Sequence, residues 1–283
     1  MKVSGALLII LFSTCLISGS AQTLNETYAY AENLKESGNY ELAIKNYKRV
    51  LFFDSAYIYP QTSWQIADCF YASAQYTDAL YFYQQAFNEA ANDSVRAAST
   101  IMKAATNIRL HDYNNALIDI YSFTGTANSE QKFNLRILEG IVCYNVGKYK
   151  EAELNFNNAA TLAGFHDTIK LEKRFKAIEK IEHRYNPKQA RVMSIIIPGL
   201  GQTYSGNYVS GINSFVLTMG LLTGAVLLTT NINPVDAFLI VLPWFQRYYM
   251  GGYRNAYNLT LDKQSEKKQE NLKEIINMLS KSN

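Results

Sequence analysis

The apolar and polar positions of this chain divide it into three regions with different patterns. A short apolar run lies near the N-terminus, from Ala6 to Ile17. From about Leu24 to Arg184, apolar residues recur at the three- and four-residue spacings that are typical of amphipathic helices. Beyond Pro187 the chain is apolar again, with one uncharged stretch from Gly211 to Thr230. The pattern predicts an all-α protein with a water-soluble helical part and a membrane-associated part.

The first 21 residues have the layout of a secretory signal peptide. Lys2 precedes an apolar run that is too short to span a bilayer, and small residues follow it up to Ala21. We therefore expect export, with cleavage after Ala21. Cys15 leaves open a second possibility, lipoprotein processing, although Phe12 and Thr14 differ from the residues usual in that signal.

One short segment of the middle region occurs four times. The copies read GNYELA, AQYTDA, HDYNNA and GKYKEA, and their last residues are Ala43, Ala79, Ala116 and Ala152, spaced 36, 37 and 36 residues apart. A fixed period of this length indicates one supersecondary unit per repeat, and such units bury their apolar faces by stacking. The small first residue allows a sharp turn between two helices. Four positions after each alanine a bulky residue shares its helix face: Tyr47, Tyr83, Ile120 and Phe156.

This unit resembles the tetratricopeptide repeat (TPR), which is two antiparallel helices in about 34 residues. The resemblance implies a TPR-like helical-hairpin solenoid of four repeats over residues 22–164. Residues 165–186, with an apolar stripe of Ile169, Phe175, Ile178 and Ile181, are expected to cap it. By the same resemblance, the first helix of each repeat lines a concave groove that binds another protein. The expected groove residues are Tyr28, Glu32, Lys35, Trp64, Asp68, Tyr71, Arg109, Tyr144 and Asn145.

Residues 187–257 are expected to form a membrane module. The stretch 211–230 is long enough to cross the hydrocarbon core of a bilayer. Within it, Gly220 and Gly224 lie on one face, where a second helix can approach closely. A second, shorter membrane segment is expected at about 236–253, with Arg247 near its end, so one or two crossings are possible. The amphipathic tail, residues 258–283, is expected to lie on a neighbouring surface.

The start of this module carries the motif I-P-G-x-G-Q-x-Y-x-G. Its residues are Pro198, Gly199, Gly201, Gln202, Tyr204 and Gly206. The motif resembles that of small two-helix membrane domains in Gram-negative envelope proteins. The resemblance implies a location in the cell envelope, with periplasmic repeats anchored in a membrane, which we expect to be the inner membrane.

Composition and motifs point away from catalysis and from nucleic acid. The net charge of +3 is small, and no stretch interleaves basic and aromatic residues. His111, His166 and His183 have no partner at a metal-ligand spacing, and no nucleotide-binding or nucleophile motif occurs. Cys69 and Cys143 fall on expected helices two repeats apart, which predicts two buried thiols rather than a disulfide. We expect no enzyme activity, no metal and no cofactor.

Two functions fit these expectations. The first is a non-enzymatic envelope scaffold, in which the groove binds a protein partner and the module holds the complex at the membrane. In the alternative, the membrane module is the active part, in envelope assembly or small-molecule transport, and the repeats serve as its docking platform. Its polar residues of interest are Asn213, Asp236 and Arg247.

Overall fold

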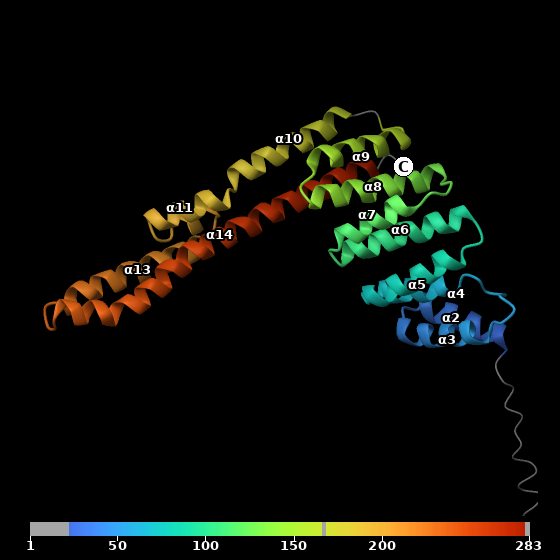
Figure 1. The fold of residues 1–283 in the computed structure, drawn as a ribbon, viewed down its shortest axis with the longest axis horizontal. Helices are drawn as coiled ribbons and strands as arrows, with labels where there is room; N and C mark the ends of the chain where they lie inside the picture. The colour runs from blue at the N-terminus through green and yellow to red at the C-terminus, as the bar shows by residue number, and fades with distance from the viewer. Residues whose placement is uncertain (1–22, 166–167, 281–283) are drawn as a thin grey trace, which may run out of the picture. The chain divides into compact units, whose positions relative to one another are not determined.

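The structure is a computed structural model that describes residues 23–165 and 168–280 (Figure 1). The expected signal peptide and Cys15 lie outside the described residues. Every regular element within them is an α-helix, which confirms the all-α prediction. The chain forms two compact units, one ending at Val142 and the other beginning at Cys143. This boundary falls inside a helix, rather than at the expected ends of the repeats or of the cap.

The first unit is a succession of helices that pack largely in adjacent pairs. The helices are α2 (Leu24–Glu36), α3 (Tyr40–Phe53), α4 (Thr62–Ala72), α5 (Tyr76–Glu89), α6 (Asp93–Arg109), α7 (Tyr113–Ser122) and most of α8 (Ser129–Asn145). Contacts join α2 to α3, α3 to α4, and so on to α7. Such adjacent pairing is the arrangement of a helical-hairpin solenoid.

The four turns between paired helices share one geometry. Gly38, Ala74, His111 and Gly147 all have positive φ, between 58° and 81°. At each turn the next amide donates to a carbonyl five residues earlier, over 2.8 Å, as in Asn39 to Leu34. This closes the end of the first helix and explains the preference for a small residue. The lone His111 is a turn residue in this conformation.

The repeat register expected from the sequence is confirmed by burial. The four repeat alanines are fully buried, as are Tyr47, Tyr83 and Phe156, while Ile120 is 8% exposed. Cys69 and Cys143 are buried thiols and neither is part of a disulfide in the described structure, as expected. The alanines keep paired helices close, and the bulky residues fill the space between them.

After the end of α8, the described part of the second unit contains five helices of 10 or more residues and one short one. They are α9 (Tyr149–Leu162), α10 (Thr168–Arg184), α11 (Pro187–Ile196), α12 (Leu200–Tyr204), α13 (Tyr208–Leu228) and α14 (Pro234–Ser280). Helix α10 packs on α9 and α14, its Leu171, Phe175 and Ile178 are buried, and the Phe175 ring lies 6.2 Å from that of Phe156 on α9. The expected stripe is wrong at Ile169, which is 63% exposed, because the stripe begins at Leu171.

Helix α14 is continuous over 47 residues, where the sequence suggested a short membrane segment and a separate tail. Its first part lies beside α13 and α11, and its last part lies beside α10 (Figure 1). Leu272, Ile275 and Leu279 are almost fully buried. The glycine pair at 251–252 does not break the helix, because neighbouring helices support it there.

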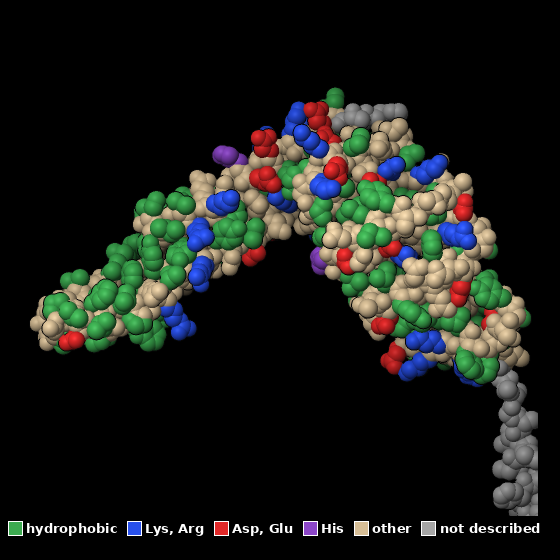
Figure 2. Space-filling view, viewed as in Figure 1, with side chains coloured by type: hydrophobic (Ala, Val, Ile, Leu, Met, Phe, Trp, Pro, Cys, Tyr) green, Lys and Arg blue, Asp and Glu red, His purple; other side chains and the backbone are tan. Residues whose placement is uncertain are grey.

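One described helix, α13, is long and apolar enough to cross a membrane by length and composition. Its bounds, Tyr208–Leu228, agree with the expected 211–230. Side chains of α13 and of the start of α14 expose many apolar groups, which Figure 2 shows gathered over that part of the unit.

Candidate functional site

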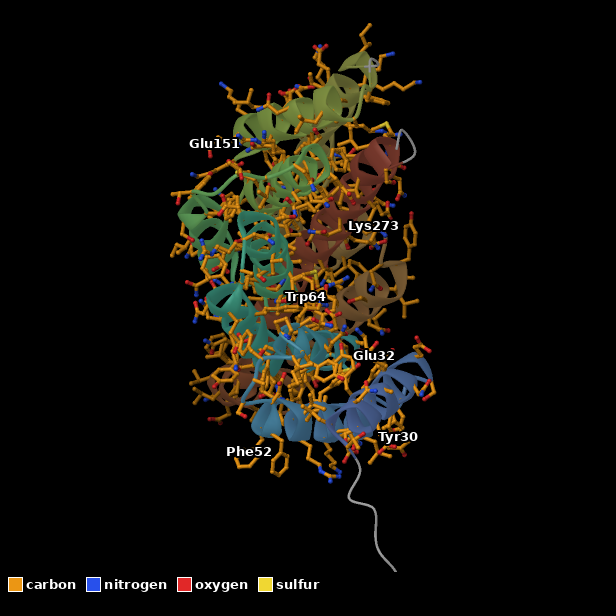
Figure 3. The ribbon with its side chains drawn as sticks, turned by 90° about the vertical axis from the view of Figure 1, so that its right-hand side faces the viewer. Tyr30, Glu32, Phe52, Trp64, Glu151 and Lys273 are labelled. Atoms are coloured by element: carbon orange, nitrogen blue, oxygen red, sulfur yellow. The ribbon has the colours of Figure 1, made fainter. Side chains whose placement is uncertain are left out.

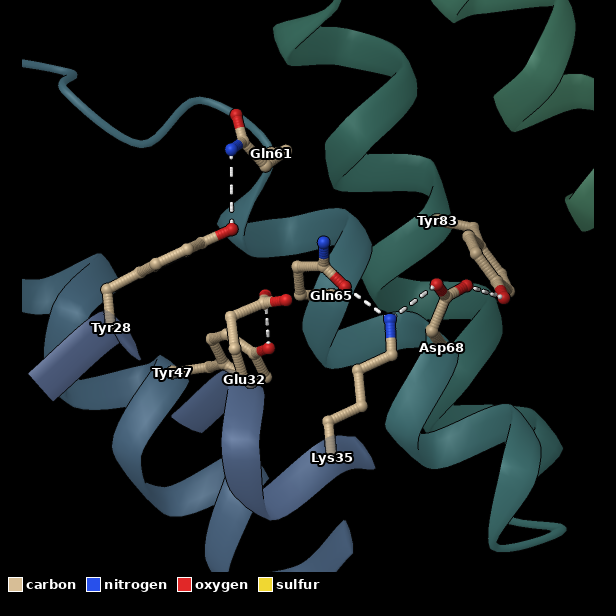
Figure 4. Close-up of polar contacts among 8 residues, drawn as sticks. All are labelled: Tyr28, Glu32, Lys35, Tyr47, Gln61, Gln65, Asp68 and Tyr83. Carbon is tan, nitrogen blue, oxygen red and sulfur yellow. Dashed lines mark hydrogen bonds and ion pairs between the residues drawn. The ribbon is translucent and has the colours of Figure 1, made fainter. Parts of the chain in front are cut away.

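Acidic side chains on α2 and α4 are held by buried tyrosines of the following helices. The Tyr47 hydroxyl donates to Glu32, and the Tyr83 hydroxyl donates to Asp68 over 2.8 Å (Figure 4). Burial is the main cause that raises the pKa of both tyrosines, and the nearby carboxylates add to it. Both hydroxyls therefore remain protonated donors, and their hydrogen bonds fix the orientation of the Glu32 and Asp68 side chains.

Lys35 links the first two repeats. Its Nζ donates to Asp68 Oδ2 at 3.0 Å and also to Gln65. The Lys35 and Asp68 side chains are each 27% exposed, so a partner can still reach the pair. Three of the expected groove residues, Glu32, Lys35 and Asp68, thus lie in one row in Figure 4, where a hydrogen bond links Lys35 to Asp68 and another links Glu32 to Tyr47. Figure 3 shows Glu32 and Trp64 among the side chains of the first unit.

Aromatic groove residues surround this row. Tyr28 stacks on Tyr59 with 4.3 Å between ring centroids. Trp64 and Tyr71, seven residues apart on α4, both meet the buried Tyr83 ring edge to face, at 5.4 and 6.5 Å. These two rings therefore also pack against the core of the repeats, a role that the sequence pattern did not indicate.

Arg109 reaches the same surface from α6. Its Nε donates to the Tyr71 hydroxyl at 3.3 Å, and the guanidinium is mostly exposed. Since a guanidinium has further donors, Arg109 can hold Tyr71 and still bind an acceptor on a partner.

A cavity of about 580 Å³ opens beside Trp64. Its wall is largely apolar, from Tyr57, Pro60, Val95 and several alanines, and Glu89 and Gln131 add polar groups. This volume lies within the usual range for ligand pockets. The sequence did not indicate the cavity because its lining comes from four helices, α4, α5, α6 and α8, and from two loops.

Tyr144 and Asn145 face the chain's own last helix. The Tyr144 hydroxyl donates to the Lys268 carbonyl at 2.9 Å and accepts from Asn271. Gln269 Nε2 donates to Asn145 Oδ1 at 2.8 Å. Burial raises the pKa of Tyr144 to about 12. The expectation that these two residues are open to a partner is therefore wrong in this structure, because the segment 268–271 already covers them.

The glycine motif of the second unit is a packing junction. A Cβ at Gly199 would lie 2.1 Å from the Gly211 carbonyl oxygen, and one at Gly201 would lie 2.0 Å from that of Ala190. Gly199 also has φ of +91°, at the start of α12. Glycine is therefore required at both positions.

Gln202 connects three helices from a fully buried position. Its Oε1 accepts from Ser194 Oγ at 2.8 Å, and its Nε2 donates to the Gly252 carbonyl at 2.8 Å. Ser194 Oγ in turn accepts from the Gly201 amide at 2.9 Å. This network ties α11 and α12 to α14, and it uses Ser194 and Gly252, which the motif had not included.

The remaining motif residues lie where the chain enters and leaves this junction. The Tyr204 hydroxyl donates to the Arg184 carbonyl at 2.6 Å, and so anchors the end of α10. Pro198 lies in the turn before α12, and Gly206 has φ of +90° in the turn after it. These contacts make the motif a structural element of the module.

The expected close approach at Gly220 and Gly224 is wrong in this structure. A Cβ at either would have no atom within 4 Å, and both line an open crevice of about 480 Å³ between α13 and α14. The tight contact lies instead at Gly252, where a Cβ would be 2.6 Å from Ser214 Oγ. The packing of α13 on α14 is therefore closest near the glycine motif.

The polar residues of the alternative function do not converge on a site. Asn213, Asp236 and Arg247 are each exposed on the surface of the second unit. Within the described ranges, no group of three His, Cys, Asp or Glu residues could hold a metal ion. A comparison with family models finds no match, and comparisons with curated proteins and with solved structures find none.

Proposed function

We propose that this protein is a non-enzymatic, membrane-anchored scaffold of the bacterial cell envelope, whose TPR-type groove binds a protein partner. The observation that carries the proposal is the cavity beside Trp64, and the side chains of Glu32, Lys35 and Arg109 on the first helices of the repeats add polar groups to the groove that we propose. Partner surfaces are typically held by an apolar anchor in a pocket, with polar contacts around it. The cavity accepts the anchor, and the charged row fixes the orientation of the partner segment.

The second unit is the anchor in this proposal. Helix α13 has 21 residues, which gives about 31 Å of helix and matches the hydrocarbon core. Helix α14 runs back beside α13. Asn255 Nδ2 on α14 donates to Ser210 Oγ near the start of α13 at 2.9 Å, so the stretch 234–254 of α14 runs alongside α13 and has the same length. The turn between them is polar, with Asn231, Asn233 and Asp236, which suits emergence into water.

This geometry favours two crossings over one. After the hairpin, α14 continues to the surface of α10, where Arg174 forms an ion pair with Glu274, and Lys268 with Glu182 at 2.7 Å. The end of α14 therefore lies on the same side of the membrane as α10. By the export argument from the sequence, that side is the periplasm, and the membrane is the inner one.

Topology is tested by labelling single cysteines from outside. In a chain with Cys69 and Cys143 changed to Ala, Asn231→Cys and Lys267→Cys place one thiol at each end of the proposed hairpin. In intact spheroplasts, an impermeant maleimide should label Lys267→Cys but not Asn231→Cys, which should react only after lysis. Labelling of both, or of neither, in intact spheroplasts would contradict the two crossings.

Partner binding is tested by filling the cavity. Ala98 lines the cavity, so Ala98→Leu should reduce its volume while leaving the groove side chains in place. Recovery of partners by the full chain from solubilised membranes should fall, whereas the melting temperature should not. The matched control, Ala56→Leu, is on an exposed loop position outside the lining and should recover partners normally. Equal recovery by both variants would refute a role for the cavity.

A further inference from the structure

Four exposed basic residues border the apolar surface of the second unit. They are Lys188 and Arg191 on α11 and Arg247 and Arg254 on α14, together called the basic border below. In Figure 2, Lys and Arg side chains line one edge of this part of the unit. In the part of the chain that the structure describes, none of the four has an acidic side chain within 4.0 Å. Their charges therefore lack an acidic partner among the described residues.

The net charge of the whole chain resides in this module. Residues 187–257 contain these four basic residues and one acidic residue, Asp236. The rest of the chain has 23 basic residues (27 less 4) and 23 acidic residues (24 less 1), so it is neutral overall. Asp236 lies near the turn between α13 and α14, at the far end of the hairpin from Arg254. The positive charge is thus concentrated at one end of an apolar surface.

Two contacts bring three residues of the basic border to one level of the module. The Tyr249 hydroxyl donates to the Ile195 carbonyl at 2.7 Å, which docks α11 against α14. One turn further along, the Arg191 guanidinium lies over the Tyr253 ring at 5.2 Å. Lys188 is one turn beyond Arg191 on α11, and Arg254 directly follows Tyr253. The three residues therefore share the end of the hairpin at which α13 begins.

Arg247 shares a face of α14 with Arg254, seven residues and about 10 Å away along the axis. Trp244 lies three residues before Arg247 and is 53% exposed, and Tyr248 directly follows Arg247 and is 37% exposed. Exposed Trp and Tyr beside a long basic side chain are typical of the membrane interface, where the charged end reaches toward the headgroups.

We infer that the basic border binds the phosphate groups of anionic phospholipids, so that the module prefers an anionic membrane surface. This rests on the proposed anchor. At this depth the counter-charge must come from the lipid, because the protein supplies none among its described residues. Guanidinium groups match phosphate oxygens with two parallel hydrogen bonds, and three of the four residues are arginines. A basic residue near an anionic surface favours binding by about fivefold.

The test uses Trp244 as a reporter of neighbouring lipid. The chain has two tryptophans, so Trp64→Phe in the full chain leaves Trp244 alone, one helical turn from Arg247. The protein is reconstituted in vesicles that contain brominated phosphatidylglycerol, which is anionic, or brominated phosphatidylcholine, which is zwitterionic. Quenching should show about a fivefold or greater preference for the anionic lipid, and added salt should reduce it.

The variant Arg247→Gln with Arg254→Gln should lose most of this preference and still be quenched by phosphatidylcholine, which shows that it remains inserted. The matched control is Lys173→Gln with Lys180→Gln, two exposed basic residues with the same spacing on α10. It should keep the preference. Equal quenching by both lipids before substitution, or a preference that survives in the arginine variant, overturns the inference and leaves the anchor standing. Absence of quenching by either lipid overturns the anchor as well.

Discussion

Asp68 accepts a hydrogen bond from the Tyr83 hydroxyl, and Glu32 stands in the same relation to Tyr47, 36 residues earlier. Both tyrosine rings are fully buried, so their hydroxyls need these acceptors. The corresponding pairs of the third and fourth repeats are Ala105 with Ile120 and Ile141 with Phe156. A repeat that lacks the acidic residue therefore also lacks the tyrosine hydroxyl that would donate to it.

This relationship predicts a strong coupling between the two residues. Asp68→Ala leaves the Tyr83 hydroxyl without its acceptor and should lower the free energy of unfolding by about 1–3 kcal/mol. Adding Tyr83→Phe should recover part of that loss, because no buried hydroxyl then remains. A double-mutant cycle by thermal denaturation measures the coupling. Strictly additive losses would show that the pair does not act as a unit.

Helix packing in the membrane module should depend on Gly252 and not on its neighbour. Gly252→Leu places a side chain against Ser214, whereas Gly251→Leu enters open space. The first variant should lose thermal stability in detergent and become more sensitive to protease after Asn231. The second should match the parent, as should Gly220→Leu with Gly224→Leu. If Gly251→Leu lowered the thermal stability as much as Gly252→Leu, the replacement of a glycine in the helix, rather than a clash with Ser214, would explain both losses.

The end of α14 should stabilise the second unit through three buried side chains. Ile275 is fully buried, so Ile275→Ala should cost about 2–5 kcal/mol and expose Tyr144 to solvent. Lys273→Ala, on the exposed face of the same helix, should have little effect (Figure 3). Limited proteolysis at the C-terminal end, followed over time, compares the two. Similar rates would indicate that the tail does not need its contacts with α10.

The first unit should lose stability at alkaline pH. Burial raises the pKa of Cys69 to about 11 from 9.0, so folding favours the neutral thiol. That contribution is complete below pH 9 and is lost as the pH rises from 9 to 11. Tyr47 and Tyr83, whose pKa values are also raised, extend the loss above pH 10. The slope of unfolding free energy against pH between 9 and 11 should be shallower in Cys69→Ala, and an unchanged slope would contradict this cause.

The repeats could be predicted because their signal is local and periodic. The alanine, the turn residue and the bulky residue recur every 36 or 37 residues. In every repeat the alanine and the bulky residue are buried. The cap was harder, since the phase of an amphipathic helix depends on which neighbour it meets. Leu171, rather than Ile169, is buried for that reason.

The contacts of the site that were missed depend on partners far away in the chain. Tyr144 is covered by residues 124 and 127 positions later, which no local pattern indicates. The glycine spacing at 220–224 predicted a contact face, but the position of α14 is set by the network through Gln202 and Gly252. Apolar length still predicted the extent of α13 as a helix, because it needs no knowledge of neighbours.

The most direct test of the scaffold is site-specific photo-crosslinking in intact membranes. A photoreactive phenylalanine replaces Trp64 in the groove or, as a control, Tyr81, which is 67% exposed on the second helix of the same repeat. The account predicts that irradiation joins the Trp64 position, but not the Tyr81 position, to a discrete protein, and that Ala98→Leu suppresses this product. An equal product from both positions, or a product from Tyr81 alone, would contradict binding in the groove.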